Sequence, residues 1–331
     1  MAPELILGIE SSCDDTAAAV VDEDGNVLSS VIVSQAEIHN PYGGIWPELA
    51  SRAHIDKAIP AIRQALEEAG ISHSDLMSIG VTRGPGLIGS LMVGVDTARA
   101  LGEGWDLPVR GINHLRGHLR SADLNERRIQ FPATILLVSG GHTFLAYMTS
   151  PQDVRLLGST RDDSVGEAYD KVARMLGEGY PGGPIVDRLA REGTSVFDLP
   201  RPMLRDGLDF SFSGLKTAVR MRLVGRPDVA KEDVAASFVD ACMDVLTAKA
   251  AAALDRHPSR CLVVVGGVAA SPQLRERAQL LCDDRGVALS LPPLRWSTDN
   301  AAMIALAAWD YVHADVAMDL APVSSLSIER F

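Results

Sequence analysis

Two histidines spaced four residues apart, His114 and His118, are the first feature of this sequence that could do chemistry. Residues at this spacing lie on the same face of an α-helix, so both imidazoles can reach one cation. Far along the chain, the segment Ser-Thr-Asp-Asn at 297–300 supplies a third ligand, the carboxylate of Asp299. Two imidazoles and one carboxylate predict a metal site.

Three turns rich in glycine, hydroxyl or small residues suggest nucleotide binding, the first two of them at the phosphates. They are Glu10-Ser-Ser-Cys-Asp-Asp-Thr16, Ser139-Gly-Gly-His-Thr143 and Val265-Gly-Gly-Val-Ala-Ala-Ser-Pro272. Backbone N–H groups of such turns can point at an anion, and Gly140 and Gly141 let the chain approach it closely. The third turn is expected to border the nucleoside at a helix N-terminus. A metal and a nucleotide in one crevice indicate an enzyme that acts on an activated substrate.

Composition places the chain among ordinary globular proteins. Its 331 residues are 47% hydrophobic and 22% charged, and the length allows two domains. The net charge of -12 argues against a protein that coats nucleic acid indiscriminately, but it permits a local basic patch. Four scattered cysteines without a C-x-x-C pair are typical of reduced thiols, so we expect a cytoplasmic protein. We expect no signal peptide, because the N-terminus has no basic region and only a short apolar run. We expect no membrane contact, because no apolar run approaches the ~20 residues of a membrane helix.

The hydrophobic pattern repeats one plan twice: three strands, then a helix, a strand, a helix and a strand. The first set is expected at 5–10, 17–22, 27–34, 48–69, 77–82, 87–101 and 108–112. The second is expected at 134–138, 144–148, 154–158, 232–254, 261–265, 272–283 and 287–291, with a last helix at 300–312. Two such halves predict an α/β protein of two ribonuclease-H-like lobes, the duplicated fold of the actin, Hsp70 and sugar-kinase (ASKHA) group.

The predicted lobes are residues 1–132, joined by the C-terminal helix region 300–331, and residues 133–299. The stretch 160–226 does not fit the repeat, so we interpret it as an insertion in the second lobe. Glycine and proline are dense there, above all at 179–184. At this density they predict a rigid, shaped loop.

Motifs between Leu7 and Met303 resemble those of the tRNA N6-adenosine threonylcarbamoyltransferase family, called TsaD in bacteria and once described as a sialoglycoprotein endopeptidase. The combination is specific, because sugar kinases and chaperones of the same fold lack the motifs of the insertion. The matching segments are Gly8-Ile-Glu-Ser-Ser-Cys-Asp-Asp-Thr, Arg83-Gly-Pro-Gly, Asn113-His-Leu-Arg-Gly-His, Leu137-Val-Ser-Gly-Gly-His-Thr, Gly166-Glu-Ala-Tyr-Asp-Lys-Val-Ala-Arg, Gly179-Tyr-Pro-Gly-Gly-Pro, Asp209-Phe-Ser-Phe-Ser-Gly-Leu-Lys-Thr and Thr298-Asp-Asn-Ala-Ala-Met.

This resemblance implies an enzyme that moves the threonylcarbamoyl group of threonylcarbamoyl-AMP to N6 of the adenosine 3′ to the anticodon, in tRNAs that read codons beginning with A. It implies one divalent metal per subunit, with iron as the first candidate and zinc as the second, held by His114, His118 and Asp299. The residues that it implies for adenylate binding are Leu137, Val138, Ser139, Gly140, Gly141, Asp170, Gly183, Asp187 and Ser271. It also implies partners: bacterial members work with a shortened paralogue, TsaB, and an ATPase, TsaE, whereas organellar relatives act as homodimers.

The residue types suit this chemistry. N6 of adenine is a poor nucleophile because its lone pair is delocalised, so the carbonyl must be polarised and the departing AMP stabilised. A metal with open positions serves both needs, and backbone N–H groups of the turn 139–141 can stabilise the phosphate. Asp170 and Asp187 are candidate acceptors for ribose hydroxyls. Asp14 is our candidate for the base that takes the N6 proton; it could equally order water, bind a second cation or accept a turn hydrogen bond.

Four residues depart from the family pattern. Arg116 stands where glutamate is usual, so the surroundings of the metal are expected to differ. Ser271 replaces an asparagine in the third turn, which weakens the case for that nucleotide contact. Ser297 and Val265 stand where a cysteine and a small residue are common. None of these changes removes an expected metal ligand.

A tRNA substrate has to be reconciled with the acidic composition. Five arginines lie between Arg110 and Arg128, and seven lysines and arginines lie between Arg201 and Lys231. These stretches predict a basic rim that contacts the RNA backbone, although ordinary charged helices would look the same in the sequence.

Three other functions compete with a transferase. A zinc protease needs His-Glu-x-x-His, and Leu115 occupies the position of that glutamate. A kinase or ATPase of the same fold usually begins with Asp-x-Gly-Thr and holds magnesium through carboxylates, whereas this chain has Glu10-Ser-Ser-Cys and a histidine pair. A non-catalytic scaffold would lack the histidines and the nucleotide turns. The transferase is therefore the expected function.

Overall fold

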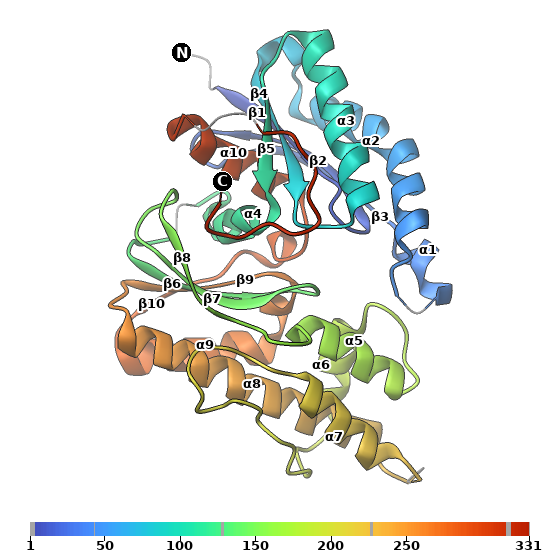
Figure 1. The fold of residues 1–331 in the computed structure, drawn as a ribbon, viewed down its shortest axis with the longest axis vertical. Helices are drawn as coiled ribbons and strands as arrows, with labels where there is room; N and C mark the ends of the chain where they lie inside the picture. Colours follow the sequence, from blue (N-terminus) through green and yellow to red (C-terminus); the bar gives the residue numbers. More distant parts are fainter. Residues whose placement is uncertain (1–3, 43, 127–128, 226–227, 316–318, 331) are drawn as a thin grey trace. The chain divides into compact units, whose positions relative to one another are not determined.

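The computed structural model describes residues 4–42, 44–126, 129–225, 228–315 and 319–330. Its contacts divide the chain into two compact units. The first consists of residues 1–128, 151–153 and 298–331, and the second of residues 129–150 and 154–297. Figure 1 labels the helices and strands of both units.

The first unit is built on a mixed sheet with the strand order β3-β2-β1-β4-β5. β1, β2 and β3 are antiparallel neighbours, whereas β4 runs parallel to β1 and β5 parallel to β4. The elements are β1 Leu5–Glu10, β2 Asp15–Asp22, β3 Val27–Ser34, α1 Ala36–His39, α2 Pro47–Ala69, β4 Leu76–Gly84, α3 Ile88–Trp105, β5 Val109–Asn113, α4 His114–Arg120 and α10 Ala301–His313, with short 3-10 helices at Asn40–Tyr42, His73–Asp75 and Ser121–Asp123.

Helices cover both faces of this sheet (Figure 1). Side chains alternate between the two faces along a strand, and Leu5, Leu7 and Ile9 of β1 join a core with α2 and α3. Gly8 points to the other face, where a Cβ would collide with the carbonyl oxygen of Ala301 on α10. The absence of a side chain at Gly8 therefore lets the start of α10 lie directly on β1.

The second unit has a sheet with the strand order β10-β9-β6-β7-β8. Its main core consists of buried apolar side chains from β6, β7 and β9 together with those of α5 to α9. The elements are β6 Ala133–Val138, β7 Thr143–Met148, β8 Val154–Ser159, α5 Val165–Met175, α6 Gly182–Glu192, α7 Ser213–Leu223, α8 Lys231–Arg256, β9 Cys261–Val265, α9 Pro272–Arg285 and β10 Ala288–Ser290, with short 3-10 helices at Gly267–Ala270 and Leu294–Trp296.

The two sheets follow the same plan. Written from the opposite edge, the second sheet reads β8-β7-β6-β9-β10, which matches β3-β2-β1-β4-β5 strand for strand. In both sheets the first three strands are antiparallel and the later two are parallel to the first. The duplication predicted from the hydrophobic pattern is therefore confirmed.

The prediction of a rigid loop across 160–226 is wrong for much of that stretch, because it contains α5, α6 and α7. The Ser164 side chain caps α5 by accepting a hydrogen bond from the Glu167 N–H at 3.1 Å. Gly182 and Pro184 lie in the first turn of α6, where N–H groups have no intrahelical acceptor. Glycine and proline are therefore compatible with the start of a helix, and their density alone does not predict a loop.

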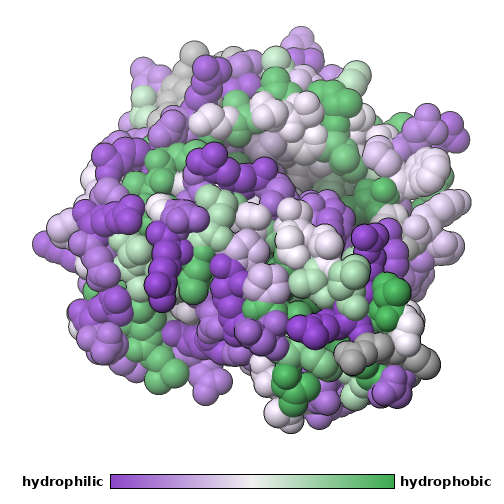
Figure 2. Space-filling view, turned by 60° about the horizontal axis from the view of Figure 1, so that its bottom comes forward, coloured by the Kyte–Doolittle hydropathy of each residue, from purple (hydrophilic) through white to green (hydrophobic). Residues whose placement is uncertain are grey.

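Hydrophilic residues cover much of the face drawn in Figure 2, and hydrophobic residues form small groups between them. Within the described ranges, no helix combines the length and the apolar content that crossing a bilayer requires.

Candidate functional site

The helix expected around the two histidines is present as α4. Asn113 begins it, since its side-chain oxygen accepts a hydrogen bond from the Leu115 N–H at 3.0 Å. The Asn113 amide group also donates to the Ser327 carbonyl at 2.9 Å, which ties the start of α4 to the segment 319–330. His114 lies in the first turn of α4, and His118 follows one turn later on the same face.

Asp299 lies two residues before the first residue of α10. Asn300 is the N-cap of α10, and its side chain accepts a hydrogen bond from the Met303 N–H at 2.9 Å. α4 packs closely on the beginning of α10 because Gly117 has no side chain, and a Cβ there would lie 2.8 Å from the Ile304 side chain. The cap and the close packing bring Asp299 to the two histidines.

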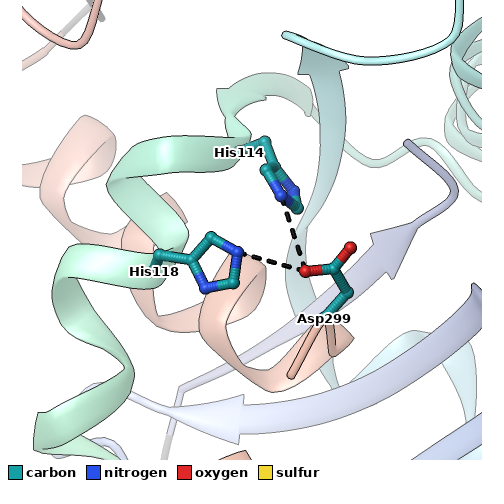
Figure 3. Close-up of side chains that lie close together, drawn as sticks. All are labelled: His114, His118 and Asp299. Carbon is teal, nitrogen blue, oxygen red and sulfur yellow. Dashed lines mark ion pairs between the residues drawn. The ribbon is translucent and has the colours of Figure 1, made fainter. Parts of the chain in front are cut away.

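Asp299 Oδ1 is the common neighbour of both imidazoles (Figure 3). It lies 3.1 Å from His118 Nε2 and 3.6 Å from His114 Nε2. The rings meet edge to face, with centroids 4.7 Å apart and an interplanar angle of 84°. One ligand atom from each of the three residues lies within 4.8 Å of the other two, so a single cation can be reached by all three.

The surroundings of His118 fit a bound cation. Its side chain is fully buried, and neither ring nitrogen has a hydrogen-bond partner among the described residues. The Asp299 oxygen is close to Nε2, but it is not aligned for a hydrogen bond. Buried polar groups are usually satisfied, and a metal at Nε2 would satisfy this one. Two imidazole nitrogens and one carboxylate oxygen suit zinc or iron better than magnesium or calcium, which prefer oxygen ligands.

The carboxylate of Glu10, at the end of β1, lies behind His114 and is completely buried. Its oxygens accept hydrogen bonds from His114 Nδ1 at 2.9 Å, Thr82 Oγ1 at 2.7 Å and the Ser12 N–H at 2.5 Å. Burial opposes a charge on His114, but the charges of Glu10 and Asp299 and the hydrogen bond to Glu10 outweigh burial and raise the pKa of His114 to about 9. Two carboxylates thus determine the charge of this imidazole.

Asp14, the candidate base, belongs to the turn between β1 and β2. Burial and the nearby charge of Asp299 raise its pKa. Burial and the charges of Asp14 and Asp299 also raise the pKa of Asp15 to about 6. His54 on α2 holds this turn, because its Nε2 is hydrogen-bonded to the Cys13 carbonyl at 3.0 Å. A carboxylate with a raised pKa is a better proton acceptor near neutral pH, which suits the role expected of Asp14.

In the second unit, Leu137 and Val138 end β6 and are buried. The turn that follows is closed by the Ser139 N–H, which donates to the His142 carbonyl at 2.8 Å. The Ser164 hydroxyl donates to the Gly140 carbonyl at 2.5 Å. Because Ser164 also caps α5, the turn is tied to the N-terminus of that helix.

The glycines expected at the adenylate face open space. Within the described part of the chain, a Cβ built at Gly140, Gly141 or Gly183 would meet nothing within 4 Å. At Gly166 on α5, by contrast, a Cβ would lie 2.5 Å from the Ser139 carbonyl oxygen. The first three positions leave room for a ligand, and Gly166 allows α5 to approach the turn.

The two aspartates expected at the ribose lie on neighbouring helices. Asp170 on α5 accepts a hydrogen bond at Oδ1 from the Gly182 N–H at 2.8 Å, so it holds the start of α6. Asp187 on α6 is 9% exposed; burial raises its pKa, and the nearby hydroxyls of Ser271 and Tyr169 oppose that shift. The structure therefore brings Asp187 and Ser271 together, with Ser271 at the start of α9.

Arg116, which replaces the usual glutamate, anchors α4 to other parts of the first unit. Its Nε donates to the Arg330 carbonyl at 3.2 Å, and its Nη1 donates to the Pro151 carbonyl at 3.2 Å. The side chain is 3% exposed. The substitution therefore changes how the histidine helix is fastened to the segment 319–330.

The predicted basic rim is wrong for Arg116 and Arg120, because both are buried. In the second stretch, Arg201 and Lys216 form ion pairs with acidic side chains of the same unit. Part of the local positive charge in the described residues is therefore neutralised within the protein. Arg127, Arg128 and Arg226 lie outside the described residues.

Sequence reasoning missed the contact between Glu10 and His114. Glu10 was expected only as part of a phosphate turn, and the structure places its carboxylate on an imidazole. One signal was available: a carboxylate ends a strand that is otherwise apolar, and buried carboxylates need partners. Which partner it meets depends on the pairing of β1 with β4 and on the position of α4, neither of which is a local property.

The TsaD family, described as tRNA N6-adenosine threonylcarbamoyltransferase, matches residues 26–306 of this chain. A relative of that name from Staphylococcus haemolyticus is 44% identical, with 98% of this chain and 97% of the relative covered. Another, from Symbiobacterium thermophilum, is 47% identical, with 96% and 94% covered. Among solved structures, component A of the (R)-2-hydroxyglutaryl-CoA dehydratase of Acidaminococcus fermentans superposes with a TM-score of 0.56 at 15% sequence identity. The superposition covers 94% of this chain and 99% of component A.

The structural likeness concerns the fold alone, and together with the two matching sheets it confirms the predicted ASKHA fold. The sequence matches extend over nearly the whole chain, and the names of the relatives confirm the predicted enzyme class, a transferase. This chain belongs to the tRNA N6-adenosine threonylcarbamoyltransferase family.

Proposed function

We propose that this chain transfers the threonylcarbamoyl group of threonylcarbamoyl-AMP to N6 of the adenosine 3′ to the anticodon, in tRNAs that read codons beginning with A. Family membership supports the acceptor and the group transferred. The observation that carries the proposal is the meeting of His114, His118 and Asp299 in a chain that matches this family over nearly its whole length.

The proposed metal is one divalent ion in the first unit, with iron as the first candidate and zinc as the second. His114, His118 and Asp299 would hold it, and when bound it would supply a Lewis acid that polarises the reacting carbonyl. Two observations support this assignment: the shared position of Asp299 Oδ1 and the unpaired ring nitrogens of buried His118, within the described residues.

The adenylate is assigned to the second unit. We expect backbone N–H groups of the turn 139–141 to bind its phosphate, since the glycines there leave room for an anion. Asp187 and Asp170 are assigned to ribose hydroxyls. Ionised carboxylates only accept hydrogen bonds, which suits binding to the hydroxyl donors of a ribose.

Asp14 is proposed as the acceptor of the N6 proton. Its raised pKa, caused by burial and by the charge of Asp299, favours this role. Asp14→Asn keeps the shape of the side chain and removes the basic oxygen. We expect it to slow transfer at saturating donor and tRNA, where binding effects no longer contribute. Unchanged transfer under these conditions would contradict the assignment.

A partner surface is proposed on α2 and α3. Ile55 and Ile59 on α2 are 63% and 43% exposed, and Ile88 and Met92 on α3 are 48% and 50% exposed. The two helices are close neighbours at this point, because a Cβ at Gly89 would meet the Ser51 side chain. An exposed apolar patch of this kind suits a protein interface, and we assign it to a TsaB-like paralogue.

A TsaE-like ATPase is the second proposed partner, and a homodimer is the alternative assembly.

We place the reaction in the cytoplasm. The proposed acceptor is a tRNA, and all four cysteines are free thiols, which is usual in reducing compartments.

The reaction is tested by incubating the purified chain with threonylcarbamoyl-AMP and unmodified tRNA, with and without the candidate partners. The tRNA is then digested and its nucleosides are identified by mass spectrometry. We expect N6-threonylcarbamoyladenosine at the position 3′ to the anticodon. Bound donor without any modified nucleoside, under every combination of partners, would contradict the proposal.

A further inference from the structure

His114 lies between two carboxylates, one at each ring nitrogen. Glu10 Oε2 is 2.9 Å from Nδ1, and Asp299 Oδ1 is 3.6 Å from Nε2. Among the described residues, the group able to share one cation contains Asp299 but not Glu10. Glu10 therefore lies on the side of the ring that faces away from the proposed metal.

The Glu10 carboxylate is held in one orientation by its surroundings. It is completely buried, and the Ser12 N–H, the Thr82 hydroxyl and His114 Nδ1 all contact it. An ionised carboxylate can only accept hydrogen bonds, so a ring nitrogen that contacts it has to carry the hydrogen. A histidine that binds a metal has to be neutral, and the one hydrogen of a metal-binding His114 is thereby fixed on Nδ1, with the lone pair of Nε2 directed toward Asp299.

We infer that Glu10 is a positioning residue for the metal centre, which fixes the tautomer and ring orientation of His114 without binding the metal itself. The inference rests on the proposed metal site. An outer carboxylate that binds the second nitrogen of a ligand histidine generally orients the ring and strengthens the ligand. Hydrogen bonds from the Ser12 N–H and the Thr82 hydroxyl hold Glu10 in place. Through Glu10, strands β1 and β4 therefore orient His114 on α4.

The second histidine has no such support. His118 Nδ1 has no hydrogen-bond partner in the described part of the chain, so its tautomer is not fixed by the protein. The two ligands are therefore unequal: the contact with Glu10 selects the tautomer of His114, whereas the metal itself would select the tautomer of His118.

The first test uses the unaltered protein. It is labelled with 15N-histidine and loaded with Zn²⁺, which is diamagnetic, and the two ring nitrogens of His114 are assigned by NMR with the help of single-histidine substitutions. We expect the metal-bound 15N shift at Nε2 and a proton on Nδ1 that is hydrogen-bonded and slow to exchange. Metal bonded to Nδ1, or an Nδ1 without a proton, would overturn the inference.

The second test measures Zn²⁺ affinity in competition with a chromophoric chelator. In Glu10→Gln, the amide oxygen can satisfy the Ser12 N–H, and the NH2 group then faces His114 Nδ1. The ring hydrogen is forced onto Nε2, so we expect affinity to fall about 10–100-fold. Glu23→Gln is the matched control, because Glu23 contacts His313 in an exposed Glu–His pair of the same unit. Affinity of Glu10→Gln within about twofold of the control would overturn the inference.

These measurements separate the role of Glu10 from the proposed reaction. The NMR result does not depend on whether Glu10→Gln folds, and neither measurement uses transfer activity. If the Nδ1 proton and the affinity loss are observed while no modified tRNA forms, the reaction fails and the role of Glu10 stands.

Discussion

At the scale of single residues, the first unit gathers four carboxylates around two buried imidazoles. Asp299 and Glu10 contact His114, and Asp14 and Asp15 lie close enough for the charge of Asp299 to raise their pKa values. Such a concentration of negative charge is unfavourable in a folded protein unless a cation balances it. The carboxylates thus favour binding of a cation and lower the stability of the protein without one.

Burial and this repulsion together predict how the stability of the protein depends on pH at Asp15. Its pKa in the folded state is about 6, above the ordinary 3.8, so the folded state binds more protons between these values. The unfolding free energy of the metal-free protein should therefore fall as pH rises from about 4 to about 6. Asp15→Asn removes that loss, and we expect it to raise the melting temperature at pH 8 by roughly 2–4 °C, with a smaller gain at pH 4.5.

Scanning calorimetry of the metal-free protein at the two pH values measures this effect. Asp75→Asn is a control that should lower the melting temperature at pH 8. Hydrogen bonds from Ser72 lower the pKa of Asp75, so they stabilise the folded protein when this carboxyl is charged. A gain for Asp15→Asn that is equal at both pH values, or a loss at pH 8, would contradict the prediction.

Part of the residue-scale picture could be predicted from sequence. The spacing of His114 and His118 predicts a shared helix face, because that relation is local and depends only on helical periodicity. The contacts of Glu10 and Arg116 could not be predicted. Arg116 was expected to alter the surroundings of the metal, and its hydrogen bonds go to carbonyls of residues 151 and 330, which are remote in sequence.

At the scale of elements, the turn 139–141 and helix α5 form one assembly. Ser164 caps α5 and also binds the Gly140 carbonyl, and Gly166 leaves the space in which the helix and the turn meet. The proposed phosphate site therefore depends on how closely α5 approaches the turn.

Gly166→Ala tests this dependence. Alanine favours a helix over glycine, but its Cβ would lie 2.5 Å from the Ser139 carbonyl oxygen, so the turn has to move. We expect AMP affinity, measured by isothermal titration calorimetry, to fall at least about tenfold, or about 1.4 kcal/mol. Gly104→Ala on α3 is the matched control, since a Cβ there meets nothing within 4 Å among the described residues. Equal AMP affinity in the two variants would refute the coupling.

The elements themselves were largely predictable where periodicity is strong. The apolar strands β1, β6 and β9 and the long helices α2 and α8 lie within a few residues of the expected bounds. Periodicity did not predict the helices of the insertion, because glycine and proline are common loop signals. In the structure, Gly182 and Pro184 occupy the first turn of α6, and the Asp170 carboxylate accepts the Gly182 N–H there.

At the scale of the whole molecule, the net charge of -12 has to be reconciled with a tRNA substrate. Arg201 and Arg277 form ion pairs with Asp240 and Asp244, so they offer little charge to a phosphate backbone. Affinity for nucleic acid comes chiefly from unpaired cations that release counterions. We therefore expect weak tRNA binding by this chain alone and stronger binding in an assembly with the proposed partners.

The partner surface gives the next prediction. Ile55→Asp places a charge in the exposed apolar patch of α2 and α3, where we expect it to weaken assembly with a TsaB-like paralogue at least about tenfold and to leave the melting temperature unchanged. Gln64→Asp is the control, because residue 64 is exposed on the opposite side of α2. Analytical ultracentrifugation measures the assembly of both variants. If Ile55→Asp leaves assembly unaffected, this patch is excluded as the surface that binds the paralogue. If it changes self-association instead, the patch is identified as a homodimer interface.

The most direct test of the central claim is the metal dependence of tRNA modification. Threonylcarbamoyl-AMP, unmodified tRNA and the partner proteins are supplied, and N6-threonylcarbamoyladenosine is quantified by mass spectrometry for the unaltered protein, His118→Ala and the control His257→Ala. We predict that the unaltered protein and the control modify the tRNA. We expect the amount of modified nucleoside to fall at least about 100-fold in His118→Ala and after metal removal. This loss is larger than the roughly 10–100-fold typical for removing a residue that only orients a metal ligand. Full modification by His118→Ala after metal removal would contradict a metal-assisted transferase.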